Sequence, residues 1–120
     1  LLVDGRCRNL ALLRDKEGLC AYLERLVDLL GMRVMGGPMV VEAAGFGPEA
    51  GATAIVIISE SHIAIHGWPE RTDYNFNFDL FSCRTFSSKA VLDSLIQELG
   101  VTSYSYRILT RPLTNPITVN

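Results

Sequence analysis

Two adjacent β-strand patterns near the middle of this 120-residue chain constrain its fold more than any other feature. Residues 52–61, ATAIVIISES, are rich in β-branched side chains, which is typical of a strand buried in a sheet. A second apolar strand pattern, HIAIHGW at residues 62–68, follows almost at once. The sequence therefore predicts a pair of strands at the centre of a sheet.

Two helix patterns flank this pair of strands. Asp15 can cap a helix whose apolar residues recur at helical spacing, and Gly31 ends it. A second helix pattern starts near Ser87 or Ser88, carries one apolar stripe and stops at Gly100. Both helices are amphipathic, so each is expected to place its apolar side against the sheet.

Further strand patterns complete the sheet. Residues 74–83, YNFNFDLFSC, alternate with period two, with Phe76, Phe78 and Leu80 on one face. Extended segments are also expected at residues 1–4, 33–43 and 103–109. Because most strands are joined by turns, the predicted fold is α+β: a two-layer sandwich with two helices packed on one face of a mainly antiparallel sheet. The length indicates a single domain over residues 1–120.

The composition argues against several classes of protein. Hydrophobic residues at 48% and charged residues at 20% are typical of a soluble globular protein. A net charge of −2 without a basic segment argues against a nucleic-acid partner, and no apolar run is long enough to predict a membrane span. The cysteines Cys7, Cys20 and Cys83 show no CxxC spacing, so neither a disulfide framework nor a zinc site is predicted. A reducing cytoplasm is the expected location.

Residues 56–70, VIISESHIAIHGWPE, gather the chain's reactive groups: both histidines, the only tryptophan, and a serine directly after a glutamate. On a strand, the four residues from His62 to His66 span about 13 Å, so the two imidazoles cannot easily share one metal ion. No third ligand of the usual kind lies nearby. We therefore expect no metal.

A serine hydrolase is a second interpretation, with Ser61 as nucleophile and His66 as base. The nucleophile elbow G-x-S-x-G is absent, which weakens it. A purely structural interpretation would make Ser61 and Cys83 small buried residues and His66 a hydrogen-bonded core histidine. The combination of these residues argues against that interpretation.

The segments SESHIAIHGWPE and DLFSC resemble the self-processing region of bacterial and archaeal S-adenosylmethionine decarboxylase proenzymes, most densely over residues 53–83. The resemblance implies that the Ser61 hydroxyl attacks the Glu60 carbonyl to form an ester. β-Elimination would then cleave the chain between residues 60 and 61 and convert Ser61 into a covalent pyruvoyl group. Such a group acts as an electron sink in decarboxylation, so neither a metal nor pyridoxal phosphate is expected.

The resemblance also implies roles for individual residues. His66 is the proton donor or acceptor in self-cleavage, and Thr53, where the family usually has serine, stabilises the tetrahedral precursor of the ester. Cys83 reprotonates the product carbon. Glu70 binds the ribose hydroxyls. Phe46 stacks on adenine, or alternatively is a loop phenylalanine that covers the core. Asp4 matches an acidic residue of the first strand, whereas Trp68 is interpreted as packing.

Two features qualify this site. Ser61 and His66 are an odd number of residues apart, which places them on opposite faces of a straight strand. A bend near His62 is therefore expected if both act together. Arg84 follows Cys83 where the family usually has glycine, and Ala64 and Gly67 replace common hydroxyl residues.

The predicted function is decarboxylation of S-adenosylmethionine to S-adenosylmethioninamine for spermidine biosynthesis, by a homodimer with sites at the interface. Within the same family, arginine or ornithine is an alternative substrate. From a different class, a non-catalytic homologue that regulates an active relative remains an alternative.

Overall fold

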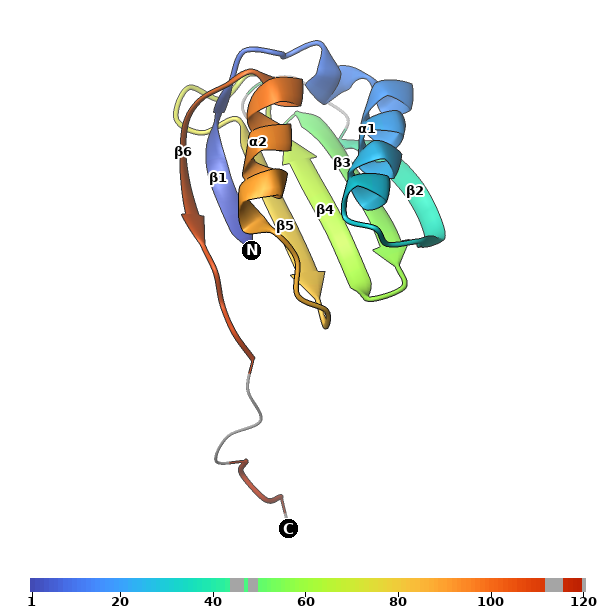
Figure 1. The fold of residues 1–120 in the computed structure, drawn as a ribbon. Helices are drawn as coiled ribbons and strands as arrows, with labels where there is room; N and C mark the ends of the chain where they lie inside the picture. Colours follow the sequence, from blue (N-terminus) through green and yellow to red (C-terminus); the bar gives the residue numbers. More distant parts are fainter. Residues whose placement is uncertain (44–46, 48–49, 112–115, 120) are drawn as a thin grey trace.

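The computed structural model describes residues 1–43, 47, 50–111 and 116–119. Its six strands form one sheet in the order β2-β3-β4-β5-β1-β6, and every neighbouring pair is antiparallel. Figure 1 shows the elements in space. In chain order they are β1 (Leu2–Cys7), the short 3-10 helix η1 (Leu12–Arg14), α1 (Lys16–Leu29), β2 (Val34–Ala43), β3 (Gly51–Ile58), β4 (Ser61–Gly67), β5 (Phe76–Ser82), α2 (Ser88–Leu99) and β6 (Val101–Arg107).

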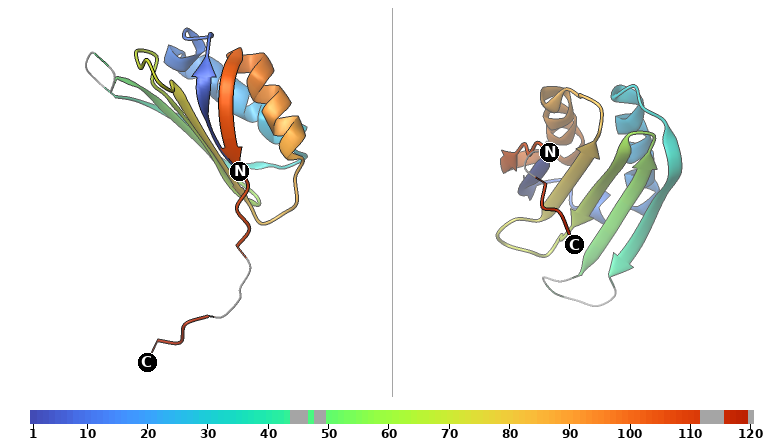
Figure 2. Two further views of the ribbon diagram at one scale, coloured as in Figure 1. Left: turned by 90° about the vertical axis from the view of Figure 1, so that its left-hand side faces the viewer. Right: turned by 90° about the horizontal axis from the view of Figure 1, so that it is seen from below.

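Both helices lie on the same face of the sheet, as the views in Figure 2 show. Within the described residues no helix covers the opposite face, which we call the open face. The predicted two-layer α+β fold is therefore confirmed. The fold class could be predicted from local sequence patterns, because an amphipathic helix and an alternating strand each have one apolar side that must be buried.

The ends of the helices follow from the residues that cap them. The Asp15 carboxylate accepts a hydrogen bond of 3.0 Å from the Gly18 N–H at the start of α1. The Ser87 hydroxyl accepts one of 3.1 Å from the Ala90 N–H at the start of α2. Gly100 ends α2 with φ of +63°, a left-handed conformation that glycine adopts at little cost. These positions match those expected from the sequence.

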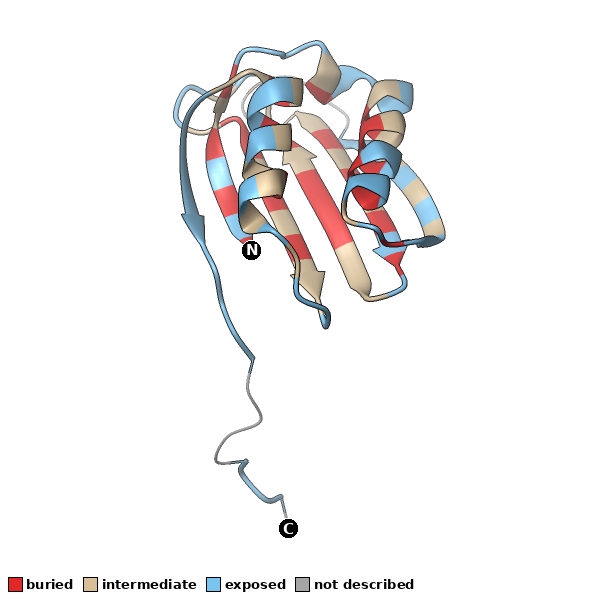
Figure 3. Cartoon of the chain, viewed as in Figure 1, coloured by how far each residue is buried: buried red, intermediate tan, exposed pale blue. Residues whose placement is uncertain are grey.

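The core lies between the helices and one face of the sheet (Figure 3). The alternation predicted for β5 is observed, since Phe76, Phe78 and Leu80 are all buried. Burying one such side chain stabilises the fold by about 2 kcal/mol. Residues of β1, η1, β3, β4, α1 and α2 also belong to the core, among them Val3, Leu13, Ala54, Val56, Ile63, Ile65, Leu23, Leu26, Val91 and Leu95.

Several expected strand boundaries differ from the structure. The last strand, for example, is Val101–Arg107 rather than residues 103–109. The first strand pattern of the central pair ends at Ile58, Ser59 and Glu60 form a turn, and Ser61 begins β4 instead of ending β3. Residues 34–43 form one strand with register shifts around Gly36, not separate extended segments. β1 continues to Cys7, beyond the predicted residue 4. In each case, pairing with a neighbouring strand decides where the strand ends.

Candidate active site

The turn between β3 and β4 holds the expected cleavage point. Ser61 pairs with Ile58 across this hairpin and with Ser82 on β5. Its φ of +150° is a value that residues with a side chain rarely adopt, and such conformations cost about 1–3 kcal/mol. The backbone is therefore strained directly at the Glu60–Ser61 bond.

Residues after β5 contact this turn. The Cys83 N–H donates a hydrogen bond of 3.0 Å to the Glu60 carbonyl oxygen. Nη1 of Arg84 lies 3.6 Å from Oε1 of Glu60, and the Ser59 hydroxyl donates to the other oxygen of the same carboxylate. We call Glu60, Ser61, Cys83 and Arg84 the processing cluster.

A second polar group lies on the open face, toward the other end of β4. Thr53 on β3 faces His66 on β4, and Oγ1 of Thr53 is 2.8 Å from Nδ1 of His66. The imidazole stacks on Trp68 with ring centres 6.1 Å apart. Nε1 of Trp68 donates to Asn77 at 2.7 Å, and Asn77 donates to Asp4 at 2.6 Å. We call these five residues the histidine cluster.

Sequence reasoning did not single out Asn77. It is one of the polar residues of the alternating β5 pattern, and the register places it directly opposite His66. Trp68, expected to serve in packing, has both a ring contact and a polar contact in the histidine cluster. The period-two pattern of β5 predicted the face on which Asn77 lies, but not its partners.

The two clusters do not meet within one chain. β4 pairs with both neighbours without a register shift from Ser61 to Gly67, so the bend expected near His62 is absent. The five residues from Ser61 to His66 span about 17 Å, and their side chains leave opposite faces of the strand. The bend that would let both residues act together within one chain is therefore not observed.

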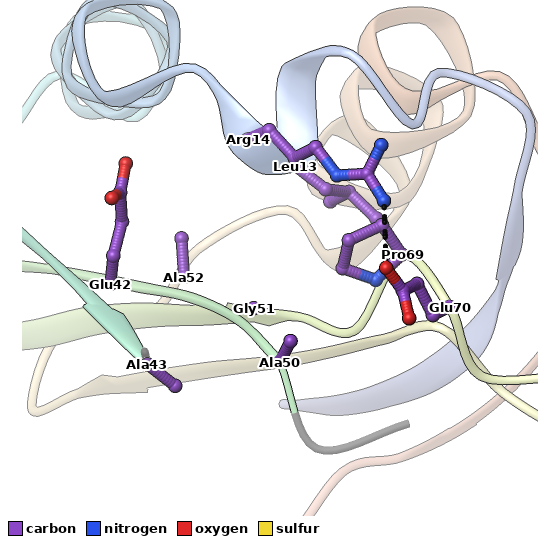
Figure 4. A pocket seen from close by; sticks show the side chains of 9 residues that line it. All are labelled: Leu13, Arg14, Glu42, Ala43, Ala50, Gly51, Ala52, Pro69 and Glu70. Carbon is purple, nitrogen blue, oxygen red and sulfur yellow. Dashed lines mark ion pairs between the residues drawn. The ribbon is translucent and has the colours of Figure 1, made fainter. Parts of the chain in front are cut away.

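Glu70 lies beside a cavity of about 450 Å³ at the His66 end of β4 (Figure 4). Its carboxylate accepts a hydrogen bond of 2.8 Å from the Gly47 N–H and lies 3.6 Å from Nη2 of Arg14. A side chain at Gly51 would collide with the Gly67 carbonyl, so the wall of this cavity requires glycine there. The lining residues are Leu13, Arg14, Glu42, Ala43, Ala50, Gly51, Ala52, Pro69 and Glu70. Phe46, the expected adenine contact, lies outside the described residues.

A second cavity, of about 560 Å³, lies at the processing cluster. Exposed Cys83 lines it together with Phe81, Arg84 and Arg111. The Arg111 guanidinium lies 4.3 Å from the centre of the Phe81 ring, a cation–π contact. The thiol of Cys83 is therefore accessible from a hollow large enough for a small molecule.

Two further observations concern the described residues only. They include no group of three His, Cys, Asp or Glu side chains that could hold a metal ion. Among them there is also no helix long and apolar enough to cross a membrane.

The fold places this chain among small α+β proteins with an antiparallel sheet that helices cover on one face. The clusters add reactive side chains on the open face of the sheet and at the ends of its strands. Within this class of proteins, the chain belongs to the S-adenosylmethionine decarboxylase family, whose model matches residues 1–112. This confirms the resemblance stated from residues 53–83.

Known proteins agree with this assignment. An S-adenosylmethionine decarboxylase proenzyme of Pyrobaculum islandicum is 31% identical to this chain over 90 residues. The matched region covers 73% of this chain and 66%, just under two thirds, of that relative. An arginine decarboxylase proenzyme of Caldivirga maquilingensis is 30% identical over 105 residues, covering 86% of this chain and 75% of that relative. The adenosylmethionine decarboxylase structure from Aquifex aeolicus has the same fold, with a TM-score of 0.65 at 20% identity over 99% of this chain and 93% of that one.

Proposed function

We infer that this chain is a proenzyme that cleaves itself between Glu60 and Ser61 and then decarboxylates S-adenosylmethionine. The observation that carries the proposal is the hydrogen bond from the Cys83 N–H to the Glu60 carbonyl, next to a serine with a strained backbone. A donor on that oxygen stabilises the negative charge that develops there when a hydroxyl attacks the carbonyl carbon. Attack by Ser61 also relieves the strain, because the peptide bond becomes an ester.

The separation of the two clusters favours a site built from two copies of the chain. Exposed apolar side chains occupy the open face: Met39 and Val41 are each 57% exposed and Ile57 is 55% exposed. If two copies pack these faces together around a two-fold axis with their β4 strands antiparallel, the His66 end of β4 in one copy lies beside the Ser61 end in the other. The histidine cluster of one copy can then reach the processing cluster of the other around its β3–β4 turn. A two-fold axis forms both sites at once.

In such a dimer each residue has a defined task. His66, oriented by the hydroxyl of Thr53, moves a proton to or from the reacting groups at Ser61 of the other copy. The pyruvoyl group derived from Ser61 supplies the electron sink for loss of carbon dioxide. Cys83, exposed in the cavity at the processing cluster, donates a proton to the product carbon.

S-adenosylmethionine is the proposed substrate because a carboxylate lines the cavity near the histidine cluster. Glu70 can accept hydrogen bonds from the two ribose hydroxyls, while Arg14 and the Gly47 N–H hold its carboxylate in place. Phe46 is proposed to stack on the adenine. The product, S-adenosylmethioninamine, would supply the aminopropyl group of spermidine. A reducing cytoplasm is the proposed location.

Arginine is the second candidate substrate, since one relative is named an arginine decarboxylase proenzyme. The pairing of Glu70 with Arg14 argues against it, because a guanidinium substrate would have to compete with Arg14 for the carboxylate. Release of carbon dioxide from each labelled substrate distinguishes the two.

Intact-mass measurement of the purified protein under denaturing conditions tests the proposal. We expect two fragments divided between residues 60 and 61, the second lighter than its serine form by one ammonia. A single full-length mass after long incubation, with no carbon dioxide released from any candidate substrate, would instead favour a non-catalytic homologue.

A further inference from the structure

We propose that Arg84 supplies the positive charge for the carboxylate that self-cleavage creates at Glu60. This inference rests on the proposed function, since it concerns the second half of the self-cleavage reaction. It assigns a task to a residue that stands where the family usually has glycine, and it explains why the side chain of Arg84 points back to the β3–β4 turn.

The guanidinium of Arg84 is held from its far side by the two residues that follow α1. Nη2 donates to the carbonyl oxygens of Leu30 at 2.8 Å and of Gly31 at 3.2 Å. These carbonyls end the helix, where the backbone dipole favours a cation. The backbone of Arg84 is also fixed, because the Ser82 hydroxyl donates to its carbonyl at 2.8 Å and accepts from its N–H at 3.0 Å.

The contacts with α1 use Nη2 alone, which leaves the N–H groups of Nη1 and Nε for Glu60. Nη1 already lies 3.6 Å from Oε1 of Glu60, whose side chain is only 19% exposed. The Cys83 N–H binds the backbone carbonyl of the same residue at 3.0 Å. The cation is therefore in place before any new charge appears at Glu60.

The chemistry of ester cleavage creates that charge. In the ester, the Glu60 carbonyl carbon is bonded to Oγ of Ser61. A base removes the Cα proton of Ser61, the Cβ–Oγ bond breaks, and its electron pair leaves with the oxygen as the Glu60 α-carboxylate, while a double bond forms between Cα and Cβ. Two carboxylates then lie on Glu60, and an adjacent guanidinium offsets their repulsion and stabilises the departing one.

The test follows both halves of self-cleavage in freshly purified full-length protein. Intact mass against time reports the completed reaction. A parallel sample treated with hydroxylamine reports the ester, because hydroxylamine splits the ester into residues 1–60 with a hydroxamate end and residues 61–120 with an intact serine. The variants are Arg84→Ala, Arg84→Lys and, as a matched control, Arg25→Ala. Arg25 is similarly exposed and pairs with Glu98 at 3.0 Å away from the site.

We expect Arg84→Ala to form the ester but to eliminate about tenfold or more slowly, so that full-length protein accumulates in a form that hydroxylamine cleaves. Arg84→Lys should recover much of the rate, since it keeps the charge, and Arg25→Ala should behave as the wild type. A general loss of structure cannot produce this pattern, because it would suppress ester formation as well.

Two outcomes overturn the inference. One is elimination at the wild-type rate in folded Arg84→Ala, and the other is an uncleaved variant from which hydroxylamine releases nothing. If Arg84→Ala does not fold, Arg84→Gln replaces it in the same assay. Glutamine keeps donors for the carbonyls at the end of α1 but carries no charge. If the wild type itself does not cleave between residues 60 and 61, the proposed function fails rather than the role of Arg84.

Discussion

The backbone N–H of Cys83 donates a hydrogen bond of 3.0 Å to the carbonyl oxygen of Glu60. The register between β4 and β5 explains this contact, because Ser61 pairs with Ser82 and the next residue reaches the turn before Ser61. The main chain of Cys83 thus contacts the bond proposed to be cleaved, while its thiol is exposed. Cys83 can therefore take part in two steps through two different groups.

Ser61→Ala should leave one full-length chain. Alanine lacks the hydroxyl that is proposed to attack the Glu60 carbonyl, and no other atom of the residue can replace it. Intact mass after long incubation measures this, with Ser59→Ala in the same turn as the control. Fragments divided between residues 60 and 61 in the Ser61→Ala protein would exclude the mechanism.

Cys83→Ala should still cleave but lose most of its turnover. The substitution keeps the backbone N–H that binds the Glu60 carbonyl and removes only the thiol proposed to donate a proton to the product. Losing a general acid costs about 100-fold or more in rate. Cleavage and carbon dioxide release are measured on the same sample, and wild-type turnover would remove the thiol from the reaction.

Thr53→Val should slow self-cleavage by about tenfold, the effect of losing a hydrogen bond of roughly 1.4 kcal/mol. Valine has nearly the same shape as threonine but cannot bind Nδ1 of His66, which lies 2.8 Å from Oγ1 of Thr53. Thr53→Ser restores the hydroxyl and should restore the rate. Equal rates in the valine and serine variants would show that the hydroxyl is not required.

Co-expression of Ser61→Ala and His66→Ala chains should restore cleavage that neither variant shows alone. In a mixed dimer, the intact Ser61 of one chain meets the intact His66 of the other. With equal expression and random pairing, about half of the His66→Ala chains should be cleaved. A length tag on one chain identifies the fragments, and an absence of cleavage in proven mixed dimers would show that both residues act within one chain.

Alkaline stability should depend on Tyr22. Burial raises the pKa of this phenol from its usual value near 10 to about 12, although its hydrogen bond to Ser94 opposes the shift. The folded protein therefore keeps the proton at a pH where the unfolded chain loses it. The stabilisation is complete below about pH 10 and is lost as the pH rises toward about 12.

Urea unfolding at pH 8 and pH 11 measures this effect in the Ser61→Ala background, which should remain one chain. At pH 8, the free energy of unfolding of Tyr22→Phe should be about 1 kcal/mol lower than that of its parent, because the hydrogen bond to Ser94 is gone. Between pH 8 and pH 11, the free energy of unfolding should fall less in Tyr22→Phe than in the parent. Tyr106→Phe, at a 51% exposed position, is the control. Parallel losses in the Tyr22→Phe protein and its parent would contradict the prediction.

The sequence predicted the elements that depend on neighbouring residues. The caps at Asp15 and Ser87, the helix end at Gly100 and the buried face of β5 all follow from local hydrogen bonding and periodicity. The family also followed from residues 53–83, because the resemblance depends on residue types at fixed spacing. The 3-10 helix η1 was missed, since Leu12–Arg14 is too short for its apolar spacing to be distinctive.

What depends on contacts between distant segments could not be predicted. The positions of Ser61 and His66 at opposite ends of a straight β4, the partners of Asn77, and the contact of Arg84 with α1 arise only when strands pair and helices pack. By itself, the sequence determined which faces of the helices and strands are buried and which reactive residue types the chain carries, because these properties depend on local spacing and composition. Only the tertiary structure decided which reactive groups meet, because strand register and helix packing set distances between residues far apart in the chain.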